Sequence, residues 1–126
     1  MREILFRGKT FNDEWVEGAL VKWSKAHSII RKYGSDTIGL YEYSVVPETV
    51  GQYIGLTDMN GEKIYEGDIV KYKEHILQVE YAEEYASYFF HNNGSVIGEC
   101  TAKYTKEYAE IIGNIYDNPE LLKVTK

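Results

Sequence analysis

Residues 61–72 read GEKIYEGDIVKY, and this stretch decides the fold because it joins turn residues to the start of an apolar strand. Asn60 and Gly61 stand between two β-rich runs, which predicts a tight hairpin. Gly67 permits a positive φ or a bulge just before an Ile-Val pair. Asp68 can accept a hydrogen bond from a nearby backbone N–H. We therefore interpret the stretch as structural, as the start of a strand whose Ile69-Val70 pair enters the core.

Two chemical interpretations of the same region fail on residue type. Gly61 and Gly67 resemble the two glycines of a phosphate-binding loop, but Asp68 stands where that loop needs Lys, and an acid there repels phosphate. Asp58 and Asn60 resemble the opening of a calcium loop, but its terminal glutamate is missing because position 69 is Ile. We interpret Asp58 as the acceptor of an Asx-type turn.

Period-two patterns dominate the rest of the chain and predict an all-β protein with roughly seven to ten short strands. The odd-numbered residues from Trp15 to Trp23 make a largely apolar and aromatic face, which we expect to be half-buried. Residues 25–34 fit a strand or a loop. Residues 101–110 fit a helix or a strand, and we favour a loop followed by a strand. Clear strand patterns occupy residues 3–7, 15–23, 37–46, 50–56, 69–73, 76–81, 86–91 and 111–116.

The C-terminal region carries a helix start. Asn118 supplies a capping acceptor, Pro119 fits the first helical position, and an acid follows in the first turn, so we expect a short helical turn there. Proline and glycine cluster between about residues 47 and 60. We accordingly expect an N-terminal β lobe at 1–54 and a C-terminal β-barrel at 55–126.

The net charge of −6 lies entirely in residues 51–126, which hold seven Lys or Arg and thirteen Asp or Glu. An acidic half repels phosphates and disfavours nucleic acid as a partner. Basic and aromatic side chains approach each other in the segment 22–33. Nucleic-acid binding there is the alternative function, with a candidate patch of Lys22, Lys25, Arg31, Lys32 and Tyr33.

Cys100 is the only cysteine, so no intramolecular disulfide can form and a reducing cytoplasm is the expected setting. No stretch approaches the ~20 apolar residues of a membrane span, and the apolar run near the N-terminus is too short for a signal peptide. His27, His75 and His91 form no ligand pair. We expect no metal, no cofactor and no catalytic residue. The enzymatic alternative is a site assembled in three dimensions around Glu66, Asp68 and His75.

Two blocks, GLTDMNGEKIYEGDIVKY at 55–72 and IIGNIYDNPELL at 111–122, resemble the YopX family of small bacteriophage and prophage proteins, as does the opening MREILFRGK. The resemblance implies short strands with an SH3-type barrel in the C-terminal part, encoded by a phage or prophage and expressed in a bacterial host. It brings no catalytic residue and no ligand. The signature positions that we expect to be structural are Gly61, Gly67, Asp68, Gly113, Asn118 and Pro119.

The sequence thus predicts a non-enzymatic binding or assembly protein that acts through protein–protein contacts. Twelve tyrosines suit contact surfaces. Short edge strands offer a route to strand addition. The expected partner is a second copy of the chain or a phage or host protein.

Overall fold

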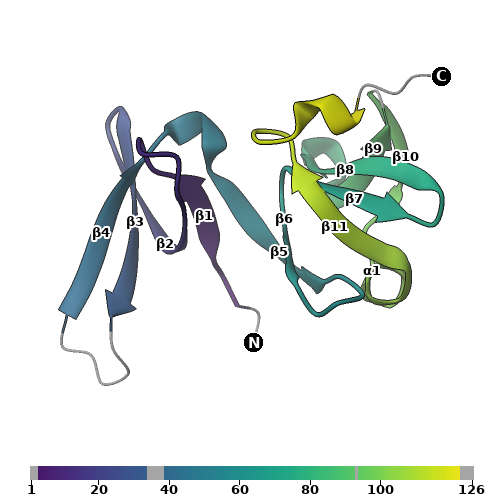
Figure 1. Cartoon of the computed structure of the whole chain (residues 1–126), viewed down its shortest axis with the longest axis horizontal. Coiled ribbons are helices and arrows are strands. Elements are labelled where there is room, and N and C mark those ends of the chain that lie inside the picture. Colours follow the sequence, from purple (N-terminus) through teal and green to yellow (C-terminus); the bar gives the residue numbers. More distant parts are fainter. Residues whose placement is uncertain (1–2, 34–38, 93, 123–126) are drawn as a thin grey trace. The chain divides into compact units, whose positions relative to one another are not determined.

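The structure, a computed structural model, describes residues 3–33, 39–92 and 94–122. These residues form two antiparallel sheets, and the predicted all-β class is confirmed (Figure 1). The described strands are β1 (Phe6–Lys9), β2 (Trp15–Trp23), β3 (Ala26–Tyr33), β4 (Gly39–Val45), β5 (Gly51–Thr57), β6 (Lys63–Tyr65), β7 (Asp68–Tyr72), β8 (His75–Ala82), β9 (Ser87–Asn92), β10 (Ser95–Glu99) and β11 (Ala109–Asn114). The helices are α1 (Ala102–Tyr108) and the 3-10 turns η1 (Pro47–Thr49), η2 (Glu83–Tyr85) and η3 (Pro119–Leu122).

The chain divides into two compact units, Met1–Tyr53 and Ile54–Lys126. β5 begins in the first unit, where it pairs with β1, and ends in the second, where it neighbours β6. Each unit has a core of its own. The core of the first unit is built on Val16, Ile29 and Val45, and that of the second on Ile64, Val70, Leu77, Val79, Phe90, Cys100 and Ala109.

In the first unit β2 buries the face opposite to the predicted one. Val16 and Gly18 are buried, whereas Trp23 is 57% exposed. The reason is steric, because Gly18 on the even-numbered face lets the backbone oxygen of Ile30 on β3 lie where a Cβ would clash. A Cβ at Gly18 would lie 3.1 Å from the Ile29 side chain. The residues 25–34, which fitted a strand or a loop, form β3 as far as Tyr33.

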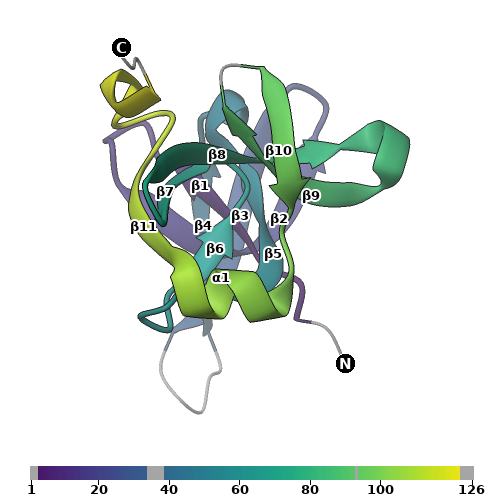
Figure 2. The ribbon, with the colours of Figure 1, turned by 90° about the vertical axis from the view of Figure 1, so that its right-hand side faces the viewer.

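The second unit contains a five-stranded sheet in the order β10-β9-β8-β7-β11. Its two edge strands, β10 and β11, are consecutive in the chain and are joined by α1 (Figure 2). The described strands therefore form an open sheet, and closure into an SH3-type barrel is not confirmed.

Two local predictions near the C-terminus need correction. Residues 102–108 form α1, so the favoured loop and strand are wrong and the helical alternative holds. η3 confirms the C-terminal helical turn, with Pro119 as its first residue. However, Asn118 does not cap this turn through its side chain. Its Oδ1 accepts from the backbone N–H of Asn114 at 3.2 Å, and its backbone oxygen accepts from Leu121 N–H.

Candidate functional site

Gly67 and Asp68 lie at the turn that leads into β7. Gly67 has a φ of +94°, and a Cβ there would lie 3.3 Å from the Tyr116 ring. Only glycine adopts such a φ without strain. Asp68 is fully buried, and its Oδ2 accepts a hydrogen bond from Tyr65 N–H at 2.7 Å. The carboxylate therefore holds the turn that precedes β7.

Asp58 joins the two signature blocks. Its Oδ1 accepts from Asn60 N–H and Glu62 N–H, each at 2.9 Å, which confirms the Asx-type turn. Its Oδ2 accepts from Ile111 N–H, also at 2.9 Å, on a strand 53 residues away in sequence. A buried carboxylate that receives three backbone N–H groups has its charge satisfied by the fold. Asp58 therefore acts as a structural link between the hairpin and β11.

The second block has a close approach at Gly113 and is joined to the first block by a backbone hydrogen bond. A Cβ at Gly113 would lie 2.5 Å from Asn118 Oδ1, so this close approach requires glycine. Ile115 N–H donates to Gly67 O, and Met59 N–H donates to Ala109 O, both at 2.9 Å. Backbone hydrogen bonds and the Asp58 carboxylate thus connect the two blocks.

Asp68 and His75, two of the three residues of the enzymatic alternative, do not come together. Asp68 is the first residue of β7, whereas His75 pairs with Tyr72 at the other end of that strand. Four residues of strand separate the two positions by roughly 13 Å. Within residues 3–33, 39–92 and 94–122, no three His, Cys, Asp or Glu side chains are grouped to hold a metal ion.

Cys100 and His91 have structural environments. Burial, with a smaller contribution from Glu99, raises the pKa of the Cys100 thiol to about 12, so the thiol stays protonated at neutral pH. A protonated thiol is a poor nucleophile and packs as a small apolar group. His91 Nδ1 lies 3.4 Å from Glu80 Oε1 on the neighbouring strand.

The basic segment spreads over the β2–β3 hairpin. Lys22, Lys25 and Arg31 are exposed, and the side chains of Lys32 and Tyr33 lie outside the described part of the structure. Lys22 pairs with His27, four residues before Arg31, so about 13 Å of strand separates the two cations. Arg31 Cζ lies 5.4 Å above the Tyr43 ring.

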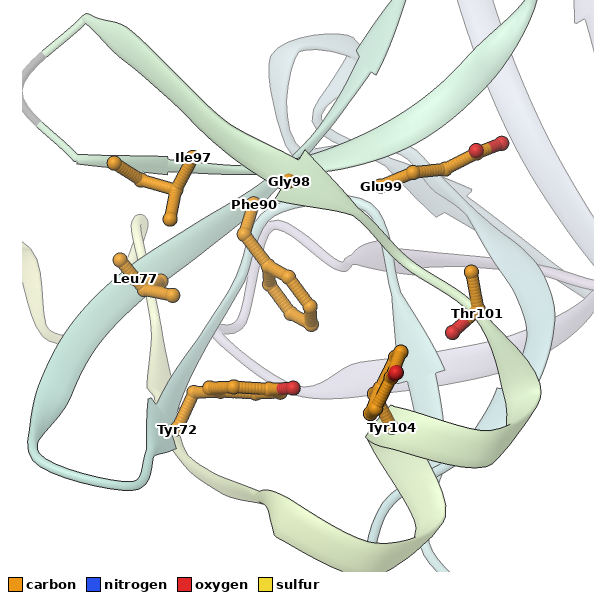
Figure 3. Close-up of a pocket in the computed structure, with 8 residues that line it drawn as sticks. All are labelled: Tyr72, Leu77, Phe90, Ile97, Gly98, Glu99, Thr101 and Tyr104. Carbon is orange, nitrogen blue, oxygen red and sulfur yellow. The ribbon is translucent and has the colours of Figure 1, made fainter.

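A cavity of about 360 Å³ lies in the second unit, on the face of the sheet that carries Phe90 (Figure 3). Leu77 and Phe90 are buried and form its floor, whereas Ile97 and Tyr104 are exposed and border its mouth. The residues that line it are Tyr72, Leu77, Phe90, Ile97, Gly98, Glu99, Thr101 and Tyr104.

The cavity is apolar and aromatic, with few polar groups. The Phe90 ring projects into it, and the hydroxyl of Tyr72 points toward Tyr104 (Figure 3). The Glu99 carboxylate turns away and accepts a hydrogen bond from Ser87 Oγ at 2.6 Å (Figure 3). Thr101 Oγ1 is buried and has no hydrogen-bond partner among the described residues. This hydroxyl is therefore an unsatisfied polar group at the wall of the cavity.

Tyr72 connects the cavity to further aromatic rings. Its centroid lies 5.2 Å from that of Phe90 and 5.8 Å from that of Tyr108. Burial raises the pKa of Tyr72 above its ordinary value of 10.0, and Tyr104, Tyr108 and Glu107 raise it further. This environment disfavours negative charge.

The cavity was not predicted from the sequence. Its wall includes Tyr104, which reaches it only because residues 102–108 are helical. The available signal was the spacing of Tyr104 and Tyr108 by one helical turn, among residues that favour helix. Their rings stack at 6.3 Å with an interplanar angle of 24°.

Three comparisons place the chain among known proteins. The family model described as YopX protein matches residues 5–123. No curated protein matches the chain significantly. The crystal structure of protein EF1440 from Enterococcus faecalis is similar, with a TM-score of 0.60 and 24% sequence identity, covering 98% of this chain and 100% of that one. At this identity the likeness shows the fold alone. None of the described helices is both long and apolar enough to span a membrane.

Proposed function

The chain belongs to the YopX family, and from this premise we propose that it is a phage or prophage protein that binds other proteins and is not an enzyme. The observation that carries the proposal is the position of the aromatic cavity beside the edge strand β10. Apolar surface next to an edge strand suits recognition of an extended segment, because the edge supplies backbone bonds and the cavity receives a side chain.

The two edges of the five-stranded sheet differ. The β11 edge is covered, since Ala109 O and Ile111 N–H bond to Met59 and Asp58. In the described structure β10 pairs with β9 and with no second strand. Val96 and Ile97 on β10 are 49% and 54% exposed. An apolar edge strand is a template for pairing unless charge or cover protects it.

The two buried acidic residues of the family signature support binding over catalysis. Asp58 and Asp68 are both fully buried and both receive backbone N–H groups. A general acid or base must reach its substrate, and these carboxylates are engaged by the scaffold.

The proposal also covers the detailed fold of the C-terminal unit and the cellular location, both of which the family resemblance implies. The C-terminal unit is taken as an SH3-type arrangement in which α1 joins the two edge strands. The protein is taken to act in the cytoplasm of a bacterial host, as a homo-oligomer or bound to a phage or host protein.

Two measurements test the proposal. Size-exclusion chromatography with light scattering reports self-association, and affinity capture from induced host cells reports other protein partners. The wild-type chain is compared with Val96→Lys, which places a charge on the β10 edge. Met59→Lys is the matched control, because Met59 is also exposed and lies in the same unit. We expect an assembly or a captured protein that Val96→Lys loses and Met59→Lys keeps. A strict monomer that captures the same proteins in all three forms contradicts the proposal.

Nucleic-acid binding through residues 22–33 is the second candidate. One observation favours it: Arg31 stacks on Tyr43, whose ring centroid lies 5.9 Å from that of Tyr41. Adjacent rings and cations suit single-stranded nucleic acid. Replacement of Lys22, Lys25, Arg31 and Lys32 together should then abolish a salt-sensitive affinity. No mobility shift of single- or double-stranded probes at low salt contradicts this candidate.

A further inference from the structure

We propose that the cavity receives a tyrosine side chain from an extended segment of a partner protein that pairs with β10. This inference rests on the proposed function and names the partner's chemistry. A strand added to β10 would lie about 4.8 Å from it. Gly98 pairs with Phe90, so both positions face the cavity side of the sheet. Alternate side chains of an added strand face the same side and lie beside the cavity mouth.

The cavity has room for an aromatic ring. Its volume of about 360 Å³ lies near the lower end of the range of about 300–1,000 Å³ for small-molecule sites. Rings from β7, β9 and α1 border it, namely Tyr72, Phe90 and Tyr104 (Figure 3). Aromatic rings favour offset or edge-to-face contacts with a further ring.

Thr101 favours a ring that carries a hydroxyl. Its Oγ1 is buried without a partner in the described structure, and its hydroxyl points toward the cavity (Figure 3). A buried hydroxyl without a partner costs free energy, so its presence calls for an explanation. A tyrosine hydroxyl can both donate to it and accept from it.

Charge restricts the partner further. The lining contains no basic residue, and its one carboxylate, that of Glu99, turns away from the cavity. A neutral ring therefore fits, and none of the lining residues would pair with a phosphate or carboxylate. Residues 51–126 carry the whole net charge of −6. The residues that flank the tyrosine in the partner should accordingly be basic or neutral.

Calorimetric titration with synthetic peptides tests the inference on the full chain. The probe is the acetylated, amidated heptapeptide Lys-Thr-Val-Tyr-Val-Thr-Lys. Matched probes replace the central Tyr by Phe or by Ala, or both Lys by Glu, and N-acetyl-tyrosinamide supplies the ring without a strand. We expect the Tyr peptide to bind at least tenfold more tightly than the Ala peptide and than N-acetyl-tyrosinamide. Phe should weaken binding by about three- to tenfold, the effect of one hydrogen bond. The Glu peptide should bind more weakly at low salt.

Two variants assign the effect to the cavity. A Cβ at Gly98 meets no atom within 4 Å, and Gly98 lines the cavity, so we expect the side chain of Gly98→Leu to occupy part of the cavity and to abolish binding. Val96→Leu is its control, because Val96 pairs with His91 and faces the other side. Thr101→Val keeps the shape of the side chain and removes the hydroxyl. It should equalise the Tyr and Phe peptides without weakening the Phe peptide, and should raise the urea midpoint of the free protein.

Each alternative outcome overturns the inference in a distinct way. Equal binding of the Tyr and Ala peptides excludes the ring. Equal affinity of N-acetyl-tyrosinamide and the Tyr peptide excludes pairing with β10. Unchanged binding by Gly98→Leu excludes the cavity. If no peptide binds but partner capture is still lost in Val96→Lys, this inference fails and the proposed function stands. If capture is also unaffected, both fail.

Discussion

Replacement of Asp58 tests whether the family signature is a scaffold. Its carboxylate receives three backbone N–H groups, two inside the hairpin and one, from Ile111, on β11. Asp58→Ala removes all three bonds. Asn60 and Glu62 are exposed, so their N–H groups can turn to water, whereas Ile111 is half-buried. Each bond to a charged group contributes about 1.5–3 kcal/mol, and a buried donor left unpaired costs about 1–3 kcal/mol.

We therefore expect Asp58→Ala to lower the free energy of unfolding by about 3–5 kcal/mol, a large share of the ~5–15 kcal/mol typical of a domain. Asp58→Asn keeps one side-chain oxygen, which accepts from the hairpin while the NH2 group faces Ile111 N–H. If the amide flips, the oxygen accepts from Ile111 N–H and the NH2 group faces the hairpin. It should cost about 2–3 kcal/mol, from the loss of the link to β11.

Urea unfolding followed by circular dichroism measures these losses, and amide hydrogen exchange locates them. The matched control is Glu62→Gln, a neutralisation on the exposed part of the same hairpin, which should change stability by under ~0.5 kcal/mol. The Ile111 amide should exchange faster in both Asp58 variants. If Asp58→Ala is as stable as Glu62→Gln and Ile111 keeps its protection, the structural interpretation of Asp58 is wrong.

Three further changes probe the same unit. Gly67→Ala should lower the free energy of unfolding in urea by about 1–3 kcal/mol, which is more than Gly55→Ala should. Gly55 and Gly67 both have a positive φ, but only Gly67 lies against Tyr116. Equal losses would show that the Tyr116 contact is unimportant. Gly113→Ala should lower the free energy of unfolding by at least ~2 kcal/mol, and adding Asn118→Ala should recover part of this loss. If the losses of the two single variants simply add in the double variant, the close approach of Gly113 and Asn118 is contradicted. The raised pKa of Cys100 means that the folded state holds the thiol proton more tightly than the unfolded state does. The stabilisation that comes from the raised pKa of Cys100 is therefore complete below pH 9.0 and is lost as the pH rises to about 12. Over this range the free energy of unfolding falls by up to ~1.4 kcal/mol per pH unit. Cys100→Ala should unfold in urea with a shallower alkaline slope; an unchanged slope would refute the assigned burial.

The scaffold could be predicted from the sequence because its constraints are local. Gly67 and Asp68 specify a turn through the φ of one residue and the side chain of the next, and Asp58 forms its Asx turn within four residues. Its bond to Ile111 N–H lies 53 residues away, and no local pattern indicates such a contact.

The cavity was missed because it depends on tertiary packing. Residues 102–108 satisfy both helical and strand spacing, and the helix is the form that joins the edges β10 and β11. On β2, aromatic residues suggested the buried face, yet Gly18 on the other face admits Ile29. Glycine has no hydrophobic signal, so the pattern alone indicates the wrong side.

An NMR titration of the labelled wild-type chain with the Tyr heptapeptide separates scaffold from binding site in a single experiment. The account predicts that amide shifts concentrate at residues 96–104 and at Phe90, while the amides of Asp58, Asp68 and Ile111 stay in place. Shifts centred on the hairpin at 58–68, or no shifts at all up to the solubility of the peptide, would contradict it.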